Sequence, residues 1–303
     1  GINAEYGRYY EAMVESDDQL FLQLNVTQQQ VSLANDCDVR KNCLILKMKQ
    51  YKRSFQDRND FQCVFSDSVE FISTKMFRGC PALKTVVLPN LISMDEFELD
   101  QYGSEGNFSN CSLLSSFIAP KLRNVHDECF QDCIALKNIF LFQTIKICYN
   151  AFYGCTQLRR AVFPNLIELD SYSFADCEQL EEFDASQLVH LHVSAFFNCS
   201  KLKLVCVPED VNFSCSQHCS NCFICRGEVQ ETLERGKQLV KRPMAKFMGQ
   251  RFNSWMHLDL KVEELNRVQN AGRQLAVELM EKQWGYKVLF SEPRTGRWGS
   301  VYG

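Results

Sequence analysis

A phenylalanine followed three residues later by a cysteine recurs along the middle of this chain. From Phe108 onward the interval between successive phenylalanines is 22 residues, four times in succession. A fixed period of this length is typical of a solenoid, in which each repeat forms one coil that cannot bury its apolar face alone. The pairs are Phe77–Cys80, Phe108–Cys111, Phe130–Cys133, Phe152–Cys155, Phe174–Cys177 and Phe196–Cys199.

The remaining apolar residues follow the same period. Counted from the phenylalanine as position 0, one unit reads F-x-x-C-x-x-L-x-x-V-x-L-P-x-L-x-x-I, and four residues separate it from the next unit. The L-x-x-V-x-L part predicts a short strand, which the proline ends because proline donates no hydrogen bond to a neighbouring strand. The L-x-x-I part predicts a second extended segment. The F-x-x-C part predicts a turn or short helix with both side chains in the core.

The unit resembles the leucine-rich repeat of the BspA-like family. The resemblance covers residues 55–211 in about seven units, of which the first is degenerate because Arg58 stands in place of the cysteine. It implies a leucine-rich-repeat solenoid of parallel β coils joined by short turns or helices. It also implies recognition of proteins or surface ligands, including adhesion in extracellular members.

Four regions are predicted along the 303 residues. Residues 1–54 form an N-terminal region with a capping strand at residues 44–48, and residues 55–211 form the repeats. Residues 212–226 form a cysteine-rich cap. Residues 227–303 form a mainly α-helical region, which could be a truncated part of a longer domain. An acidic insertion at residues 95–106 has two interpretations, a binding loop or a tolerated surface bulge.

The C-terminal region lacks the repeat and is rich in helix-forming residues. One helix is expected from Glu228 to Val240, ahead of Pro243. A second helix is expected to begin near Asp259, because apolar residues then recur at steps of three and four. Its apolar face could pack on the solenoid or pair with a second copy in a dimer.

The outward positions of the predicted strands indicate a binding surface for a protein ligand on the concave strand face. The residues at position 10 form an apolar stripe. Beside it, a pair of basic residues in one repeat adjoins a group of acidic residues in the next repeat. Exposed apolar stripes with polar rims are typical of protein interaction sites. The alternative is that the stripe shields the sheet while the charges pair across adjacent strands. The candidate residues are Val87, Ile118, Phe140, Val162, Arg159, Arg160, Glu181, Glu182 and Asp184.

Ten of the 16 cysteines fall into two groups. The six repeat cysteines are expected to be buried, unpaired thiols, because coil-to-coil disulfides would strain the stack. Four other cysteines and a histidine lie within 11 residues, and this spacing allows an incidental reduced cap, a zinc site or two disulfides. These residues are Cys215, His218, Cys219, Cys222 and Cys225. Apart from zinc at this cap, no cofactor is expected.

Composition and motif searches exclude several function classes. The net charge of −4 argues against a general nucleic-acid binder, and no run of 18 apolar residues predicts a membrane span. No G-x-S-x-G, phosphate-binding glycine loop or H-E-x-x-H occurs, so we do not expect an enzyme. The alternative is a targeting module for a truncated enzyme whose catalytic part would follow residue 259. Unpaired repeat cysteines favour an intracellular location, whereas five N-x-S/T sequons leave the cell surface as the alternative.

Overall fold

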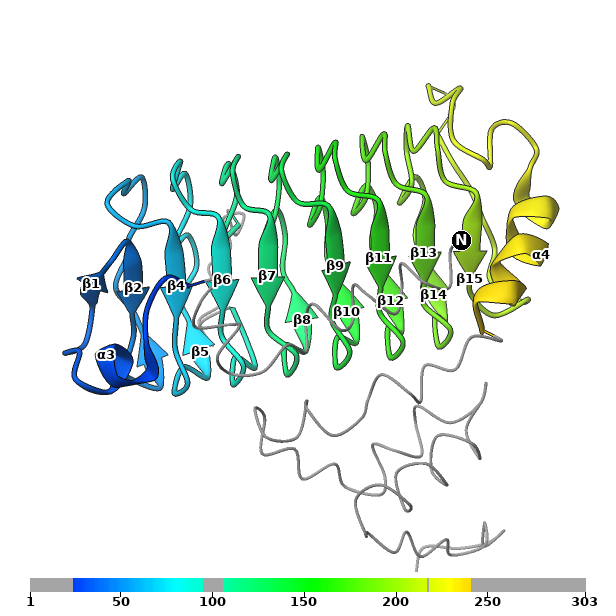
Figure 1. The fold of residues 1–303 in the computed structure, drawn as a ribbon. Helices are drawn as coiled ribbons and strands as arrows, with labels where there is room; N and C mark the ends of the chain where they lie inside the picture. Colours follow the sequence, from blue (N-terminus) through cyan, green and yellow to red (C-terminus); the bar gives the residue numbers. More distant parts are fainter. Residues whose placement is uncertain (1–23, 95–105, 217, 241–303) are drawn as a thin grey trace, which may run out of the picture.

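The computed structural model describes residues 24–94, 106–216 and 218–240, which form a stack of coils with strands on two sides (Figure 1). The expected helix near Asp259 and the insertion at residues 95–105 lie outside the described residues. The division into four regions stays a prediction. Within the described residues, no helix is long and apolar enough to span a membrane.

One side of the stack carries three-residue strands, named here the front strands. They pair in parallel as β2-β4-β6-β7 and as β9-β11-β13-β15. The residues at template position 9, such as Ile139, Ala161 and Phe183, lie opposite one another in register. The strands are β2 (Cys43–Ile45), β4 (Cys63–Phe65), β6 (Thr85–Val87), β7 (Ser116–Ile118), β9 (Asn138–Phe140), β11 (Arg160–Val162), β13 (Glu182–Asp184) and β15 (Leu204–Cys206).

The second side carries two-residue strands, named here the back strands, which correspond to the L-x-x-I part of the repeat. These are β3 (Gln50–Tyr51), β5 (Phe71–Ile72), β8 (Asn124–Val125), β10 (Lys146–Ile147), β12 (Glu168–Leu169) and β14 (His190–Leu191). They also pair in parallel, as β3-β5 and as β14-β12-β10-β8. The predicted parallel β solenoid is therefore confirmed for the repeats.

A column of phenylalanine rings runs through the core. Phe130, Phe152 and Phe174 are fully buried, and successive rings stack with centroids 5.1 and 4.9 Å apart. At the N-terminal end of the column, the guanidinium group of Arg58 lies 5.3 Å from the Phe55 ring centroid. Offset stacking and cation–π contact each add stabilisation beyond burial. The phenylalanine at position 0 thus links every coil to the next.

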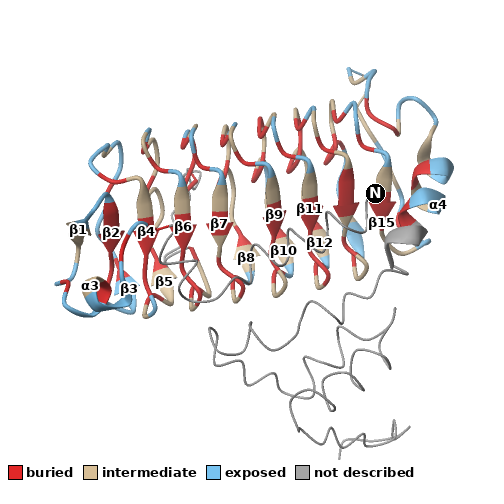
Figure 2. Cartoon of the chain, in the orientation of Figure 1, coloured by how far each residue is buried: buried red, intermediate tan, exposed pale blue. Residues whose placement is uncertain are grey.

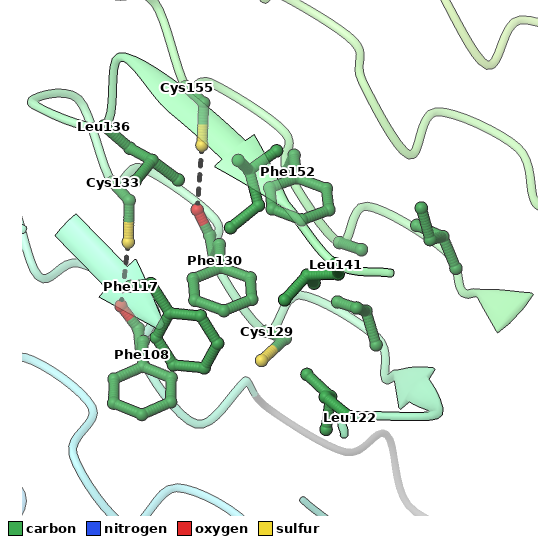
Figure 3. Close-up of a cluster of buried hydrophobic side chains, with 14 of the residues drawn as sticks. Phe108, Phe117, Leu122, Cys129, Phe130, Cys133, Leu136, Leu141, Phe152 and Cys155 are labelled. Carbon is green, nitrogen blue, oxygen red and sulfur yellow. Dashed lines mark hydrogen bonds between the residues drawn. The ribbon is translucent and has the colours of Figure 1, made fainter. Parts of the chain in front are cut away.

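The repeat cysteines form a hydrogen-bonded ladder beside this column. The Sγ of Cys133 donates to the carbonyl oxygen of Phe108 at 3.2 Å, and the Sγ of Cys155 donates to that of Phe130 at 3.1 Å (Figure 3). The same bond, from each cysteine to the preceding coil, recurs along all six repeat cysteines. All six are buried free thiols. The packing interpretation of the ladder is confirmed.

The residue before each ladder cysteine adopts a left-handed backbone conformation. Its φ lies between 56° and 70° in every coil, and it is always glycine, aspartate or asparagine. These residue types tolerate positive φ best. The positions are Asp57, Gly79, Asn110, Asp132, Gly154, Asp176 and Asn198, with Asp57 ahead of Arg58 in the degenerate coil. This conformation turns the chain sharply enough to close the coil.

The N-terminal end is covered by a hairpin and a short helix. β1 (Asp38–Arg40) pairs antiparallel with β2 through a turn in which Lys41 and Asn42 both have positive φ, which is typical of a tight hairpin. α3 (Gln28–Ser32) begins with a capping box between Thr27 and Gln30. The segment around α3 packs its apolar residues against the outer side of β2, β4 and β6.

The C-terminal end is covered by α4 (Val229–Val240), which coincides with the first helix expected from the sequence. α4 lies next to β15 at the end of the stack (Figure 1). The approach is close, since a Cβ atom at Gly236 would lie 1.9 Å from the carbonyl oxygen of Val205. Glycine at this position allows the helix to pack directly on the last strand.

Candidate functional site

The predicted apolar stripe lies on the front strands, but most of it is buried. None of the front strands carries an exposed residue, and they are drawn as buried or intermediate in Figure 2. Val87 packs with Leu24 and Val31 of the N-terminal segment. Phe140 and Val162 are each 2 % exposed, and Ile118 is partly buried. The expectation of an exposed stripe is wrong for Val87, Phe140 and Val162.

The predicted basic and acidic residues lie on neighbouring coils, and two of them pair with each other. Arg160 and Glu182 are direct partners in the β11–β13 register, and Arg160 Nε lies 3.4 Å from Glu182 Oε2. Glu181 pairs with Lys203, with Nζ and Oε2 2.9 Å apart. Arg159 is exposed. The arrangement matches the alternative in which charges pair across adjacent strands. Ligand binding by these residues stays a prediction.

Asp184 on β13 lies in a strongly desolvated position. Burial raises the pKa of its carboxyl group to about 6, and the charge of Glu182 adds to the rise. Hydrogen bonds from the Cys206 thiol and the Ser186 backbone lower the pKa and offset part of that effect. A carboxylate in such a place opposes folding when it ionises. Its burial makes Asp184 a weak candidate for direct ligand contact.

An exposed apolar row lies at the back strands, where the sequence analysis proposed no site. It consists of Ile145, Ile167 and Val189, which are 37, 42 and 61 % exposed and are named here the aliphatic row. Each residue directly precedes a back strand, and backbone bonds align the row. Ile167 N donates to Ile145 O, and Val189 N donates to Ile167 O, both at 2.9 Å. The three side chains therefore occupy one position on consecutive coils.

Polar groups border the aliphatic row. Lys146 and Glu168, which follow two of its members, form an ion pair with Nζ and Oε1 3.0 Å apart. His192 lies 3.8 Å from Glu168 and also 3.8 Å from Asp170, measured between the nearest side-chain nitrogen and oxygen atoms. An exposed apolar centre with a charged border has the composition of a protein interface. The sequence signal for this row is the apolar residue at position 15 of three repeats, a position that the consensus of the repeat gives as x.

Four of the five predicted metal-ligand residues come together beyond the last coil. The Sγ atoms of Cys215, Cys219, Cys222 and Cys225, named here the cysteine cap, all lie within 4.8 Å of one another. Cys222 Sγ is 3.7 Å from Cys215 Sγ and 3.5 Å from Cys225 Sγ. All four are free thiols. His218 is exposed and is not part of this cluster.

Backbone amides favour an ionised sulfur in the cysteine cap. Burial acts to raise the pKa of Cys219, but hydrogen bonds from the backbone N–H groups of Asn198, Cys222 and Asn221 lower it to about 6. The Asn198 bond joins the cap to the last F-x-x-C turn, with N and Sγ 3.4 Å apart. Burial raises the pKa of Cys225 to about 11. The backbone donors around Cys219 therefore favour the thiolate form of this residue.

The ladder cysteines have the opposite character. Burial raises the pKa of Cys80 to about 11 and that of Cys111 to about 12. The thiols of Cys133, Cys177 and Cys199 are shifted further in the same direction for the same reason. A thiol that stays protonated is neither nucleophilic nor a ready metal ligand. The ladder is therefore structural.

Several solved structures of leucine-rich repeat proteins match this chain. Solved structures with similar folds include a leucine-rich repeat protein from Bacteroides ovatus, at 18 % identity and a TM-score of 0.42 over 57 % of this chain and 55 % of that one. Another is the leucine-rich repeat protein of T. pallidum, at 18 % identity and a TM-score of 0.37 over 63 % of this chain and 89 % of that one. A leucine-rich cell surface protein from Faecalibacterium prausnitzii matches at 16 % identity and a TM-score of 0.29, over 55 % of this chain and 40 % of that one.

The chain thus spans about half the length of the Bacteroides protein. No curated protein sequence matches it significantly. The BspA type leucine rich repeat region matches in 6 copies, at residues 49–146 and 123–235. Together these matches extend over more than half of the 303 residues. The chain belongs to the BspA-type leucine-rich repeat family.

Proposed function

We propose that this chain is a non-catalytic protein-interaction or adhesion module, and that the aliphatic row is part of its contact surface. The observation that carries this proposal is the alignment of Ile145, Ile167 and Val189 on consecutive coils with 37 to 61 % exposure. Coils in a parallel stack are about 4.8 Å apart, so the side chains form a continuous strip. Continuous exposed apolar strips are typical of interaction sites.

The energetic contribution of the row suits a specific protein contact. Fully burying an aliphatic side chain contributes about 1.5–3 kcal/mol, and these three are already partly covered. Covering the remaining surface would therefore contribute about 1 kcal/mol per side chain. The polar border of Lys146, Glu168 and His192 would set the orientation of the partner. The partner expected on these grounds is a protein that presents an apolar segment flanked by charge.

The described thiols and carboxyl groups give no support to a catalytic role. Several of the most strongly shifted pKa values belong to buried ladder thiols, which donate hydrogen bonds to the protein's own backbone. Such contacts are required for packing and contribute nothing to chemistry on a substrate. The enzyme alternative places its catalytic part after residue 259, outside the described residues.

The test compares three full-length proteins as immobilised baits for proteins from the cells that produce the chain. One bait is wild type, and the second carries Ile145→Thr, Ile167→Thr and Val189→Thr, which keep β-branching but add hydroxyl groups. The third carries Arg159→Glu, a matched change at the exposed residue that directly precedes the front strand β11. Urea unfolding of each bait serves as the control for folding.

We expect the wild type and Arg159→Glu to retain the same partner and the triple variant to lose most of it, by about 100-fold for a loss of about 3 kcal/mol. Equal retention by the triple variant would place the site elsewhere. Loss of the partner by the Arg159→Glu bait alone would indicate that the contact surface lies near the front strands. No specific partner for any bait would contradict the proposal.

A further inference from the structure

The four sulfur atoms of the cysteine cap are spaced as ligands of one metal ion. Tetrahedral zinc binds thiolates at about 2.3 Å, which places the sulfur atoms about 3.8 Å apart. The distances from Cys222 Sγ to Cys215 and Cys225 Sγ are 3.7 and 3.5 Å. A disulfide requires about 2.05 Å between two sulfur atoms. The observed spacing fits a shared central ion better than two separate covalent pairs.

The segment that carries the cap has little other means of holding its shape. From residue 207 to residue 228 the described residues contain no helix or strand. Two of its apolar side chains, Val211 and Phe223, are buried in the core. Phe223 is fully buried and packs edge-on against Phe196 at 6.0 Å and Phe213 at 5.4 Å. Short irregular segments with a small core usually need a disulfide or metal cross-link.

The surroundings of the cap also suit a charged metal–thiolate group. Asn198 N donates to Cys219 Sγ, and backbone donors of this kind orient and stabilise thiolate ligands. Arg226 directly follows Cys225 and forms an ion pair with Glu228, with Nη2 and Oε2 2.8 Å apart. Its Nη1 also donates to Ser200 O at 3.0 Å, which ties the segment to the last coil.

We propose that Cys215, Cys219, Cys222 and Cys225 bind one structural Zn²⁺ ion that closes the C-terminal end of the solenoid. Binding forms four Zn–S bonds and releases the protons of the bound thiols to solvent. No oxidant or reductant is involved. All four positions around the ion are filled by protein sulfur, so the site is closed to substrate, and its role is to fix the cap against the last coil and β15.

The first experiment measures metal content and ligand type in the full chain purified under reducing conditions. We expect about one equivalent of zinc per chain by elemental analysis. After zinc removal, Co²⁺ should give the visible spectrum of a tetrahedral four-thiolate site. His218→Ala should leave that spectrum unchanged, since His218 lies outside the cluster. Cys225→Ser should remove one sulfur ligand and shift the spectrum, and Cys148→Ser, in a half-buried cysteine elsewhere, should not.

The second experiment keeps the proposal testable if a cap variant folds poorly. Hydrogen exchange of the wild-type chain is compared with and without a zinc chelator. We expect faster exchange at residues 212–227 and unchanged exchange near Phe108. Less than about 0.1 equivalent of zinc, or a native mass lower by the four hydrogens of two disulfides, would overturn the proposal. A Co²⁺ spectrum that changes with His218→Ala would also overturn the four-cysteine assignment.

Discussion

Replacing Phe152 should destabilise the solenoid more than its apolar area alone would require. Its ring is fully buried and stacks on Phe130 with centroids 5.1 Å apart and on Phe174 with centroids 4.9 Å apart. Each aromatic pair contributes about 0.5–1.5 kcal/mol beyond burial. Phe152→Leu retains most of the apolar volume but removes two pairs, so we expect a loss of about 2 kcal/mol. Phe152→Ala adds a cavity, and we expect a loss of about 4 kcal/mol.

The assay is urea unfolding at 25 °C followed by circular dichroism, combined with hydrogen exchange. The matched control is Phe142→Leu, in a phenylalanine that is only partly buried and lies outside the column, for which we expect less than about 1 kcal/mol. Because a solenoid is stabilised through its nearest neighbours, exchange should increase mainly in the coils that contain Phe130, Phe152 and Phe174. Equal losses for Phe152→Leu and Phe142→Leu would refute the stacked column as a stabilising element.

Three further changes test separate features of the coils. The pKa of Asp184 is raised to about 6 in the folded chain from an ordinary value of 3.8, so the unfolded state releases its proton first and stability falls between about pH 4 and pH 6. Asp184→Asn should remove this loss, with the free energy of unfolding at pH 8 raised relative to wild type and little changed at pH 4; a pH-independent difference would contradict the assignment. Gly154→Ala should cost about 1–3 kcal/mol in a urea titration, because φ is +70° and the new Cβ would lie 2.3 Å from Asp132 Oδ1; an unchanged midpoint would show that the turn relaxes. Thr144→Val should cost about 1 kcal/mol in thermal unfolding, because the Thr144 hydroxyl donates to Leu122 O at 2.8 Å, and no loss would mean that this carbonyl finds another donor.

Much of the repeat architecture could be predicted from the sequence because its period carries the information. Ile139, Ala161 and Phe183 share template position 9, and they are partners in the sheet register. The ladder cysteines were likewise predictable, since their spacing places them at one site in every coil. The left-handed turn had a signal as well, in the glycine, aspartate or asparagine ahead of each cysteine. A consensus of residue types does not reveal this signal, because glycine, aspartate and asparagine all satisfy the same requirement for a positive φ.

The accessible surface was harder to predict than the core. Strand alternation correctly assigns Val87 an outward direction, but it cannot reveal that Leu24 and Val31, from a segment without the repeat, cover it. The aliphatic row was missed because isolated exposed isoleucine or valine residues are common, and only their alignment distinguishes Ile145, Ile167 and Val189.

The cysteine cap shows the same limit at shorter range. The spacing of the four cysteines allowed zinc, disulfides or free thiols, and it gave His218 equal standing as a ligand. The fold decides between these residues, because the turns of the segment bring four sulfur atoms within 4.8 Å and leave His218 exposed. The Asn198 amide that donates to Cys219 could not be foreseen, because it comes from the preceding coil 21 residues away.

The division of the cysteines into a buried packing ladder and a metal-binding cap is tested most directly by alkylation of the native full chain, with each cysteine quantified by peptide mass spectrometry. Without a chelator, the ladder and cap cysteines should both resist labelling, while the half-buried Cys37 reacts slowly. With a zinc chelator, only Cys215, Cys219, Cys222 and Cys225 should become reactive. Ladder cysteines that label as fast as Cys37, or cap cysteines that label at the same rate with and without the chelator, would contradict this division.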